Sequence, residues 1–197
     1  MLLKRFGWAC LGLLLLAFSA KADTVTVYVD GTYAFANNGV AIPPYGGTMD
    51  GQPASFYCVD FDHEISGGTS WTATVTPLGP TTDYSSTRLN NGTEYQEIAW
   101  LLDQSLGTTN QTTQAQLQWA VWSFSGGGDP YGTNSTLLTA AANAVSGGFA
   151  ATNWEILTPT GDYGQEFFVA TPEPSSLAML AGGLIGLIML GRRKLIC

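Results

Sequence analysis

Basic residues are almost missing from the central part of this chain. The 197-residue sequence contains seven lysines and arginines against fifteen aspartates and glutamates. Six of the basic residues lie before position 22 or after position 191, so Arg88 is the only cation between the two ends. A body this acidic repels phosphate backbones and anionic lipid surfaces. The sequence therefore argues against nucleic acid and against acidic membrane surfaces as partners.

Histidine and cysteine are scarce as well. His63 is the only histidine, and Cys58 is the only cysteine between residues 23 and 170. The sequence has no Cys/His spacing typical of zinc sites and no glycine-rich phosphate loop. We therefore expect neither a metal centre nor a bound cofactor.

Long apolar runs occur only near the two ends. Residues 1–22 carry Lys4 and Arg5, an apolar run and the site Ala20-Lys21-Ala22, which is typical of a secretory signal peptide. Residues 177–190 form the second run, which would span roughly 20 Å as a helix and is short for a bilayer core of about 30 Å. The basic residues after it favour the cytoplasmic side. We expect an exported body and a C-terminal helix that enters the membrane at least transiently.

Short polar motifs frame the second apolar run, Pro172-Glu173-Pro174 before it and Arg192-Arg193 after it. This order resembles the PEP-CTERM sorting signal of Gram-negative bacteria, although Thr171 stands where that family more often has valine or another small residue. The resemblance implies recognition by an exosortase, a membrane-anchored stage before the tail is removed, and a place on the cell surface or in a biofilm or exopolysaccharide matrix. Without the motif, the tail would indicate only a short transmembrane anchor.

The chain accordingly divides into a signal peptide at 1–22, an extracellular body at 23–170 and a sorting tail at 171–197. Within the body, alternating or short apolar runs predict strands at 24–29, 32–35, 55–65, 70–76, 154–157 and 166–170. Asp30-Gly31 predicts a turn, and the regions 37–52 and 77–92 predict loops.

Helical spacing of apolar residues predicts three further elements in the body. They cover 93–106 with a stop at Gly107, a stretch from a cap at Thr112 or Thr113 to Gly126, and 137–145. The sequence therefore predicts an α+β fold with a β-rich, sandwich- or barrel-like body and two or three inserted helices. An N-terminal signal helix and a short apolar C-terminal helix complete it.

The predicted strand at 55–65 carries several acidic residues. An alternating strand would place Asp60, Asp62 and Glu64 on the face of Cys58, as a solvated acidic face or as part of a calcium site. His63 would then point to the opposite face from Cys58. That arrangement argues against a cysteine hydrolase, which would need His63 beside the thiol.

Two motifs sixty residues apart carry the main functional signal. The first is Tyr57-Cys58-Val59-Asp60, and the second is Gln118-Trp119-Ala120-Val121-Trp122, with Tyr95, Ile98, Leu101 and Leu102 at helical spacing between them. Together they resemble the thioester domains of bacterial surface adhesins. In that family the cysteine is cross-linked to the glutamine, which implies a bond between Cys58 and Gln118. Leu117 stands where the family often has threonine, and Gln114 and Gln116 are alternative glutamines nearby.

The chemistry of a thioester accounts for these residue types. A thiolate that attacks a glutamine carboxamide expels ammonia and leaves an acyl group open to amines, hydroxyls and water. Such a bond needs a dry pocket, which Tyr57, Trp119 and Trp122 could wall while Ala120 leaves room for close approach; ordinary core packing explains these residues equally well. Because the body has no lysine, no amine side chain of its own can attack the thioester. The acidic charge of the body is explained equally well by the solubility of a secreted protein.

Two functions from different classes remain open. The first is an exported surface or matrix protein that captures an amine- or hydroxyl-bearing partner through a Cys58–Gln118 thioester. It would act once per molecule and so would not be an enzyme. The second is a non-reactive structural or carbohydrate-binding protein of the exopolysaccharide matrix, in which Cys58 is a free thiol. Exported cysteines usually pair, so a lone cysteine in an oxidising compartment calls for an explanation. Both functions provide one, a thioester in the first and a free thiol in the second.

Overall fold

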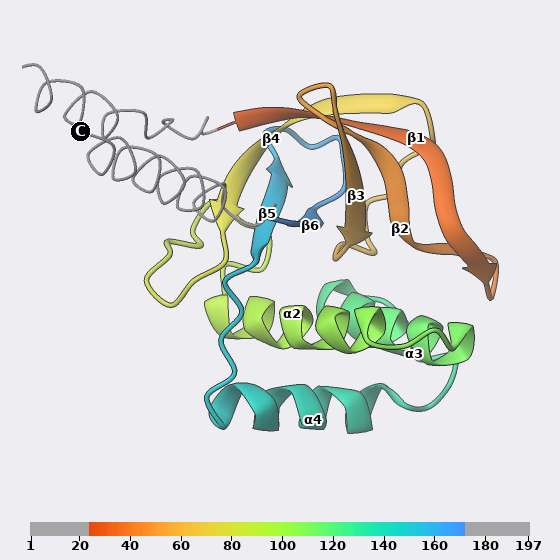
Figure 1. The fold of residues 1–197 in the computed structure, drawn as a ribbon, viewed down its shortest axis with the longest axis vertical. Helices are drawn as coiled ribbons and strands as arrows, with labels where there is room; N and C mark the ends of the chain where they lie inside the picture. The colour runs from red at the N-terminus through yellow and green to blue at the C-terminus, as the bar shows by residue number, and fades with distance from the viewer. Residues whose placement is uncertain (1–23, 172–197) are drawn as a thin grey trace, which may run out of the picture.

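The computed structural model describes residues 24–171, and these residues form a closed barrel with a layer of helices against it. The predicted signal helix and C-terminal helix lie outside the described residues. Figure 1 shows α2 and α3 beneath the barrel and α4 below them. The prediction of a β-rich, sandwich- or barrel-like body with two or three helices is confirmed at this level, as a barrel with three helices.

Six antiparallel strands form the barrel in the order β1-β2-β3-β6-β5-β4. Val25, Val27 and Val29 alternate with exposed residues, so β1 turns its valines into the barrel. A closed barrel has no free edge to pair with another chain. The strands are β1 (Thr24–Asn37), β2 (Val40–Met49), β3 (Gln52–Cys58), β4 (Thr69–Pro77), β5 (Trp154–Pro159) and β6 (Phe167–Ala170).

The prediction of a loop at 37–52 is wrong, because this region holds β2 between two tight turns. Asn38 and Gly39 have φ of 49° and 81°, and Asp50 and Gly51 have φ of 50° and 76°. Two consecutive positive φ values characterise the two-residue hairpin turn that Asn-Gly and Asp-Gly favour. The prolines and glycines inside β2 concealed a strand that these two turns delimit.

The predicted turn at Asp30-Gly31 is also wrong. β1 continues through it, and its register against β2 shifts between Val29 and Tyr33, as at a β-bulge. Gly31 has φ of 92°, and a Cβ added at Gly67 would lie 2.5 Å from the Cα of Gly31. The bulge thus lies directly against the turn before β4, at a contact that requires glycine.

The helices agree closely with their sequence patterns. They are α2 (Gly92–Leu106), α3 (Gln111–Trp122), a 3₁₀ turn η1 (Ser123–Ser125) and α4 (Asn134–Ser146). The predicted stop at Gly107 is confirmed. The cap of α3 is Asn110 rather than Thr112 or Thr113, since its side chain accepts from the Thr113 N–H at 3.1 Å. No helix within 24–171 is long and apolar enough to cross a membrane.

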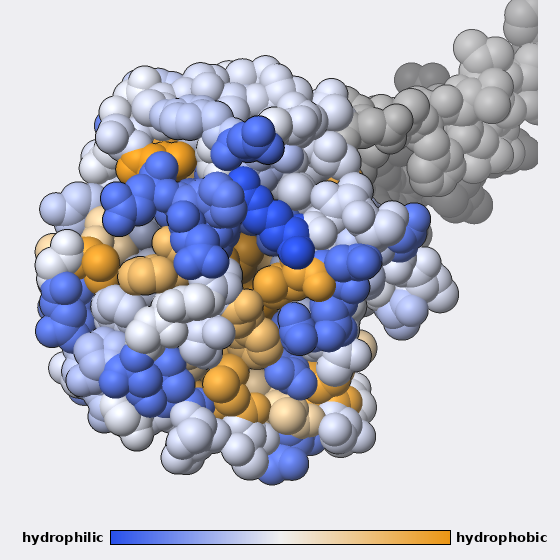
Figure 2. Space-filling view, turned by 180° about the vertical axis from the view of Figure 1, so that it is seen from behind, coloured by the Kyte–Doolittle hydropathy of each residue, from blue (hydrophilic) through white to orange (hydrophobic). Residues whose placement is uncertain are grey.

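Two apolar clusters form the core, and α3 contributes to both. Ala115, Trp119 and Trp122 join the cluster inside the barrel, which includes Cys58. Leu117, Ala120 and Val121 join the cluster between the barrel and the helices. On the face opposite to that of Figure 1, apolar residues appear in several groups separated by polar ones (Figure 2). Because α3 lies between the two clusters, a side chain on it can reach the end of β3.

Candidate functional site

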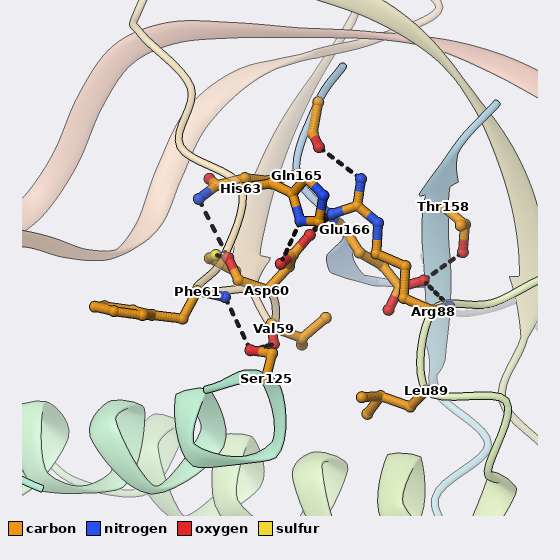
Figure 3. Close-up of polar contacts among 12 residues, drawn as sticks. Val59, Asp60, Phe61, His63, Arg88, Leu89, Ser125, Thr158, Gln165 and Glu166 are labelled. Carbon is orange, nitrogen blue, oxygen red and sulfur yellow. Dashed lines mark hydrogen bonds and ion pairs between the residues drawn. The ribbon is translucent and has the colours of Figure 1, made fainter. Parts of the chain in front are cut away.

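The chain leaves the sheet directly after Cys58, so the predicted strand through residue 65 is wrong. The Ser125 hydroxyl donates to the Val59 carbonyl at 2.9 Å and accepts from the Phe61 N–H at 2.8 Å, which ties residues 59–61 to η1 (Figure 3). Ser125 thereby provides the backbone partners that a neighbouring strand would otherwise supply. The predicted acidic face does not form, because Asp60 is buried whereas Asp62 and Glu64 are exposed.

Cys58 and Gln118 lie side by side in the interior. The Gln118 Nε2 donates to the backbone carbonyl of Cys58 at 2.8 Å, and only 1% of Cys58 and 3% of Gln118 are exposed. The alternative Gln114 instead donates to the Thr108 carbonyl at 2.9 Å. The end of β3 and the middle of α3 therefore bring together the cysteine and the glutamine that the motifs single out.

The Cys58 thiol sits in an apolar setting that keeps it protonated. Its Sγ donates to the Asp60 carbonyl at 3.1 Å. Burial, the largest effect, raises the pKa of the thiol to about 12, and the charge of Glu166 also raises it. The Trp122 indole and the Arg88 charge lower the pKa by smaller amounts. Attack by sulfur on a carboxamide at neutral pH therefore requires that the thiol lose its proton in the same step.

The predicted pocket residues divide between the two sides of β3. Trp119 and Trp122 lie in the cluster of Cys58, with ring centroids 5.1 Å apart and each about 5.5 Å from the ring of Phe61. Tyr57 packs on the other side, with its ring 5.3 Å from Trp154, and Ala120 belongs to that second cluster too. The structure thus surrounds Cys58 with two of the four predicted residues and with Phe61.

A buried ionic network beside the site was missed at the sequence level. Arg88 forms an ion pair with Asp60, donates from Nη2 to the Gly164 carbonyl at 2.8 Å, and donates its backbone N–H to Glu166 Oε1 at 3.0 Å (Figure 3). The side chain of Asp60 is only 4% exposed. The signal was present in the sequence, because a lone cation among fifteen acidic residues is expected to find a carboxylate.

The network extends to both sides of Arg88. Tyr95 donates its hydroxyl to Glu166 Oε2 at 2.6 Å, and Thr158 donates to Oε1 at 2.6 Å. His63 contacts Asp60, with 3.0 Å between Nδ1 and Oδ1, rather than the Cys58 thiol. Among residues 24–171, no group of three or more His, Cys, Asp or Glu side chains could hold a metal ion.

A cavity of about 340 Å³ lies beside the segment that follows Cys58. Asp60, Trp122 and Gln165 are among the residues that line it. The Asp60 carbonyl accepts hydrogen bonds from the Cys58 thiol and from Gln165 Nε2, the latter at 3.3 Å. The remaining wall of the cavity includes Tyr33, Tyr45, Phe61 and Glu64. The cavity therefore shares two residues with the surroundings of the thiol, Asp60 through its carbonyl and Trp122 through the apolar cluster.

Comparison with known proteins yields a sorting motif and one distant structural likeness. No curated protein matches the chain in sequence. A solved structure, the N-terminal thioester domain of a surface protein from Clostridium perfringens, is similar with a TM-score of 0.42 and 13% identity over 76% of this chain and 98% of that one. At that identity its chemistry cannot be transferred to this chain. Residues 170–194 match the PEP-CTERM protein-sorting motif, as predicted. The chain therefore carries a sorting motif that indicates an exported surface protein of Gram-negative type, first anchored in the membrane and then processed by an exosortase.

Proposed function

We propose that the body forms an internal thioester between Cys58 and Gln118 and uses it to attach covalently to a partner. The observation that carries this proposal is the 2.8 Å contact between the Gln118 carboxamide and the Cys58 carbonyl in the interior of the protein. The protein would act once per molecule at the cell surface or in the surrounding matrix, so it would not be an enzyme. The partner would supply an amine or a hydroxyl.

The proposed reaction has two balanced steps. In the first, Cys58 Sγ attacks Gln118 Cδ, the bond from Cδ to Nε2 breaks, and the nitrogen leaves as ammonia with the thiol proton. In the second, the partner's amine or hydroxyl attacks Cδ, the bond from Cδ to sulfur breaks, and the partner's proton passes to sulfur. The products are an amide or ester at position 118 and a free Cys58 thiol.

The surroundings of the two residues suit a bond that water would otherwise cleave. Both side chains are almost fully buried, and the rings of Trp119 and Trp122 lie in the cluster of Cys58. Cys58 projects from a strand and Gln118 from a helix, and both kinds of element hold reacting groups more firmly than loops do. Arg88, the one cation nearby, has a guanidinium that stays protonated and so cannot act as a nucleophile.

Intact mass spectrometry tests the bond directly. Wild type and Cys58→Ala, expressed as the full chain and purified in the same way, share the same processed ends, so these ends cancel in the mass difference. The substitution removes one sulfur atom. The wild type should therefore exceed the variant by one sulfur minus one ammonia, and methylamine should add to the wild type alone.

Neighbouring glutamines provide the matched control. Gln118→Ala should abolish the ammonia loss, whereas Gln116→Ala should retain it. A mass difference of one full sulfur, with glutamine still present at position 118, would contradict the proposal. Glutamate at position 118 together with a free thiol would show that the bond had formed and had been hydrolysed.

The cavity supports a second candidate, a non-reactive carbohydrate-binding protein of the matrix. Tyr33, Tyr45 and Phe61 offer rings for stacking, while Glu64 and Gln165 offer hydrogen bonds to sugar hydroxyls. The high pKa of the Cys58 thiol suits an inert side chain. An intact mass without loss of ammonia, stoichiometric labelling of Cys58 by a thiol reagent once the protein is unfolded, and saturable binding of an oligosaccharide would together favour this candidate.

A further inference from the structure

Three tryptophans in the barrel cluster carry buried indole N–H groups without a hydrogen-bond partner. They are Trp71, Trp119 and Trp122, and all three side chains pack in the cluster that contains Cys58. An unpaired buried donor destabilises a fold, so each such group in a native protein calls for an explanation. A donor that is needed only when charge develops during a reaction would be one.

Trp122 differs from the other two in its position. It follows Gln118 by four residues on α3, so the two side chains are neighbours on one helix face. It also lines the cavity, which neither Trp71 nor Trp119 does. Its indole N–H lacks a well-aligned partner, yet it lies close enough to the thiol to lower the pKa of Cys58.

From this geometry we propose that the Trp122 indole N–H is the donor that stabilises negative charge on the Cys58 sulfur as the thioester breaks. The inference rests on the thioester function and adds a catalytic residue to it. A nucleophile that arrives through the cavity attacks Gln118 Cδ, and the electron pair of the C–S bond moves to sulfur. The Trp122 N–H then donates to the thiolate until the nucleophile's proton reaches it.

The low polarity of the site makes this donor important. The thiol is buried and its pKa is raised to about 12, so an unassisted thiolate is a poor leaving group there. A preorganised donor aimed at the atom where charge develops needs no reorganisation during the reaction. The Arg88 charge also lowers the pKa of the Cys58 thiol, but its guanidinium is already paired with Asp60.

The test compares Trp122→Phe with Trp71→Phe in the full-length protein. Both changes remove a buried, unpartnered indole N–H from the same cluster and keep an aromatic ring. Thioester content is measured first by intact mass, and the rate of methylamine addition is then measured for each variant. Trp122→Phe should retain the bond and react about tenfold more slowly than wild type, since a hydrogen bond to a charged group contributes on this scale. Trp71→Phe should react at the wild-type rate, and equal rates in both variants would overturn the inference.

A second measurement does not depend on the thioester. In the Gln118→Ala background Cys58 is a thiol, and its rate of alkylation by iodoacetamide, followed as the pH rises to about 9, is proportional to the thiolate fraction of the folded protein. Adding Trp122→Phe should shift this profile to higher pH by about one unit, whereas adding Trp71→Phe should leave it in place. Absence of ammonia loss in wild type would refute the thioester function. An unshifted alkylation profile would refute the role of Trp122.

Discussion

At the scale of single residues, Arg88 and its carboxylate partners hold the segment that follows Cys58. The Asp60 carboxylate forms an ion pair with Arg88, and the Asp60 backbone carbonyl accepts a hydrogen bond from the Cys58 thiol. The Glu166 carboxylate accepts a hydrogen bond from the backbone N–H of Arg88, and Glu166 directly precedes β6 in the chain. The position of the sulfur therefore depends on a buried ion pair, a kind of interaction that is costly to disrupt from one side.

Arg88→Met should destabilise the protein strongly. The change leaves the Asp60 carboxylate buried without its cation, and removing one member of a buried pair costs about 3 kcal/mol or more. Urea unfolding monitored by tryptophan fluorescence would measure the loss. Asp83→Asn provides the comparison, because Asp83 is exposed and bonds only locally to Ser85. Equal midpoints for the two variants would contradict a structural role of the ion pair.

The sequence identified some residues of the site and missed others for a definite reason. Cys58 and Gln118 stand in short motifs, so local patterns marked both residues, and the structure places Gln118 Nε2 against the Cys58 carbonyl. The network of Asp60, Arg88 and Glu166 joins positions up to 106 residues apart, and no local pattern marks it. Asp60 was expected on a solvated acidic face or in a calcium site because the strand was expected to continue, and its burial follows from the early end of β3.

At the scale of the elements, the contact between the β1 bulge and the turn before β4 shapes one wall of the cavity. Gly31 and Gly67 both line the cavity, and their backbones lie too close for a side chain at Gly67. The cavity and the strand register therefore depend on the same contact.

Gly67→Ala should lower the stability by about 1–3 kcal/mol, the usual cost of forcing extra atoms into a packed contact. Its methyl group would meet the backbone of Gly31, which cannot move aside as a flexible side chain could. Gly161→Ala is the matched control, since a methyl group added at Gly161 would have nothing within 4 Å of it. Thermal unfolding of both variants would measure the difference, and a transition of Gly67→Ala that equals that of the control would contradict the tight contact.

Helices were easier to predict than strands in this protein. The helix α2 has its asparagine cap, its apolar spacing and its glycine stop all within the local sequence. The strand β3 ends at Cys58 because Ser125, more than sixty residues later, bonds the Val59 carbonyl and the Phe61 N–H in place of a neighbouring strand. Strand β2 was hidden because its prolines and glycines are typical of loops, and pairing with β1 and β3 overrides that preference.

At the scale of the whole molecule, the phenol groups of one buried and two half-buried tyrosines make stability sensitive to alkali. Burial raises the pKa of Tyr45, Tyr57 and Tyr95 above the ordinary value, and Glu166 reinforces the effect at Tyr95. In the unfolded chain these phenols lose protons near pH 10, whereas in the folded protein they keep them. Deprotonation therefore favours the unfolded state, and the stabilisation present below about pH 10 is lost as the pH rises.

The free energy of unfolding should accordingly fall between about pH 9 and pH 11. Tyr95→Phe should flatten this decline because it removes a buried phenol, whereas Tyr163→Phe is the surface control, since Tyr163 is 56% exposed. Urea titrations at several pH values would measure the slope of each variant. A slope that is unchanged by Tyr95→Phe would contradict the contribution of that phenol.

The order of elements along the chain has a mechanical consequence. Strand β6 ends at Ala170, where the sorting motif begins, and it is hydrogen-bonded to β3 on one side and β5 on the other. For a partner attached at Gln118 and a protein held by its tail, tension runs only through residues 118–171. Strands β1–β4 lie outside this path, although β3 and β4 brace β6 and β5 laterally. Pulling would therefore load the β5–β6 ladder and α4 first, and the resistance of that short segment would set the force at which attachment fails.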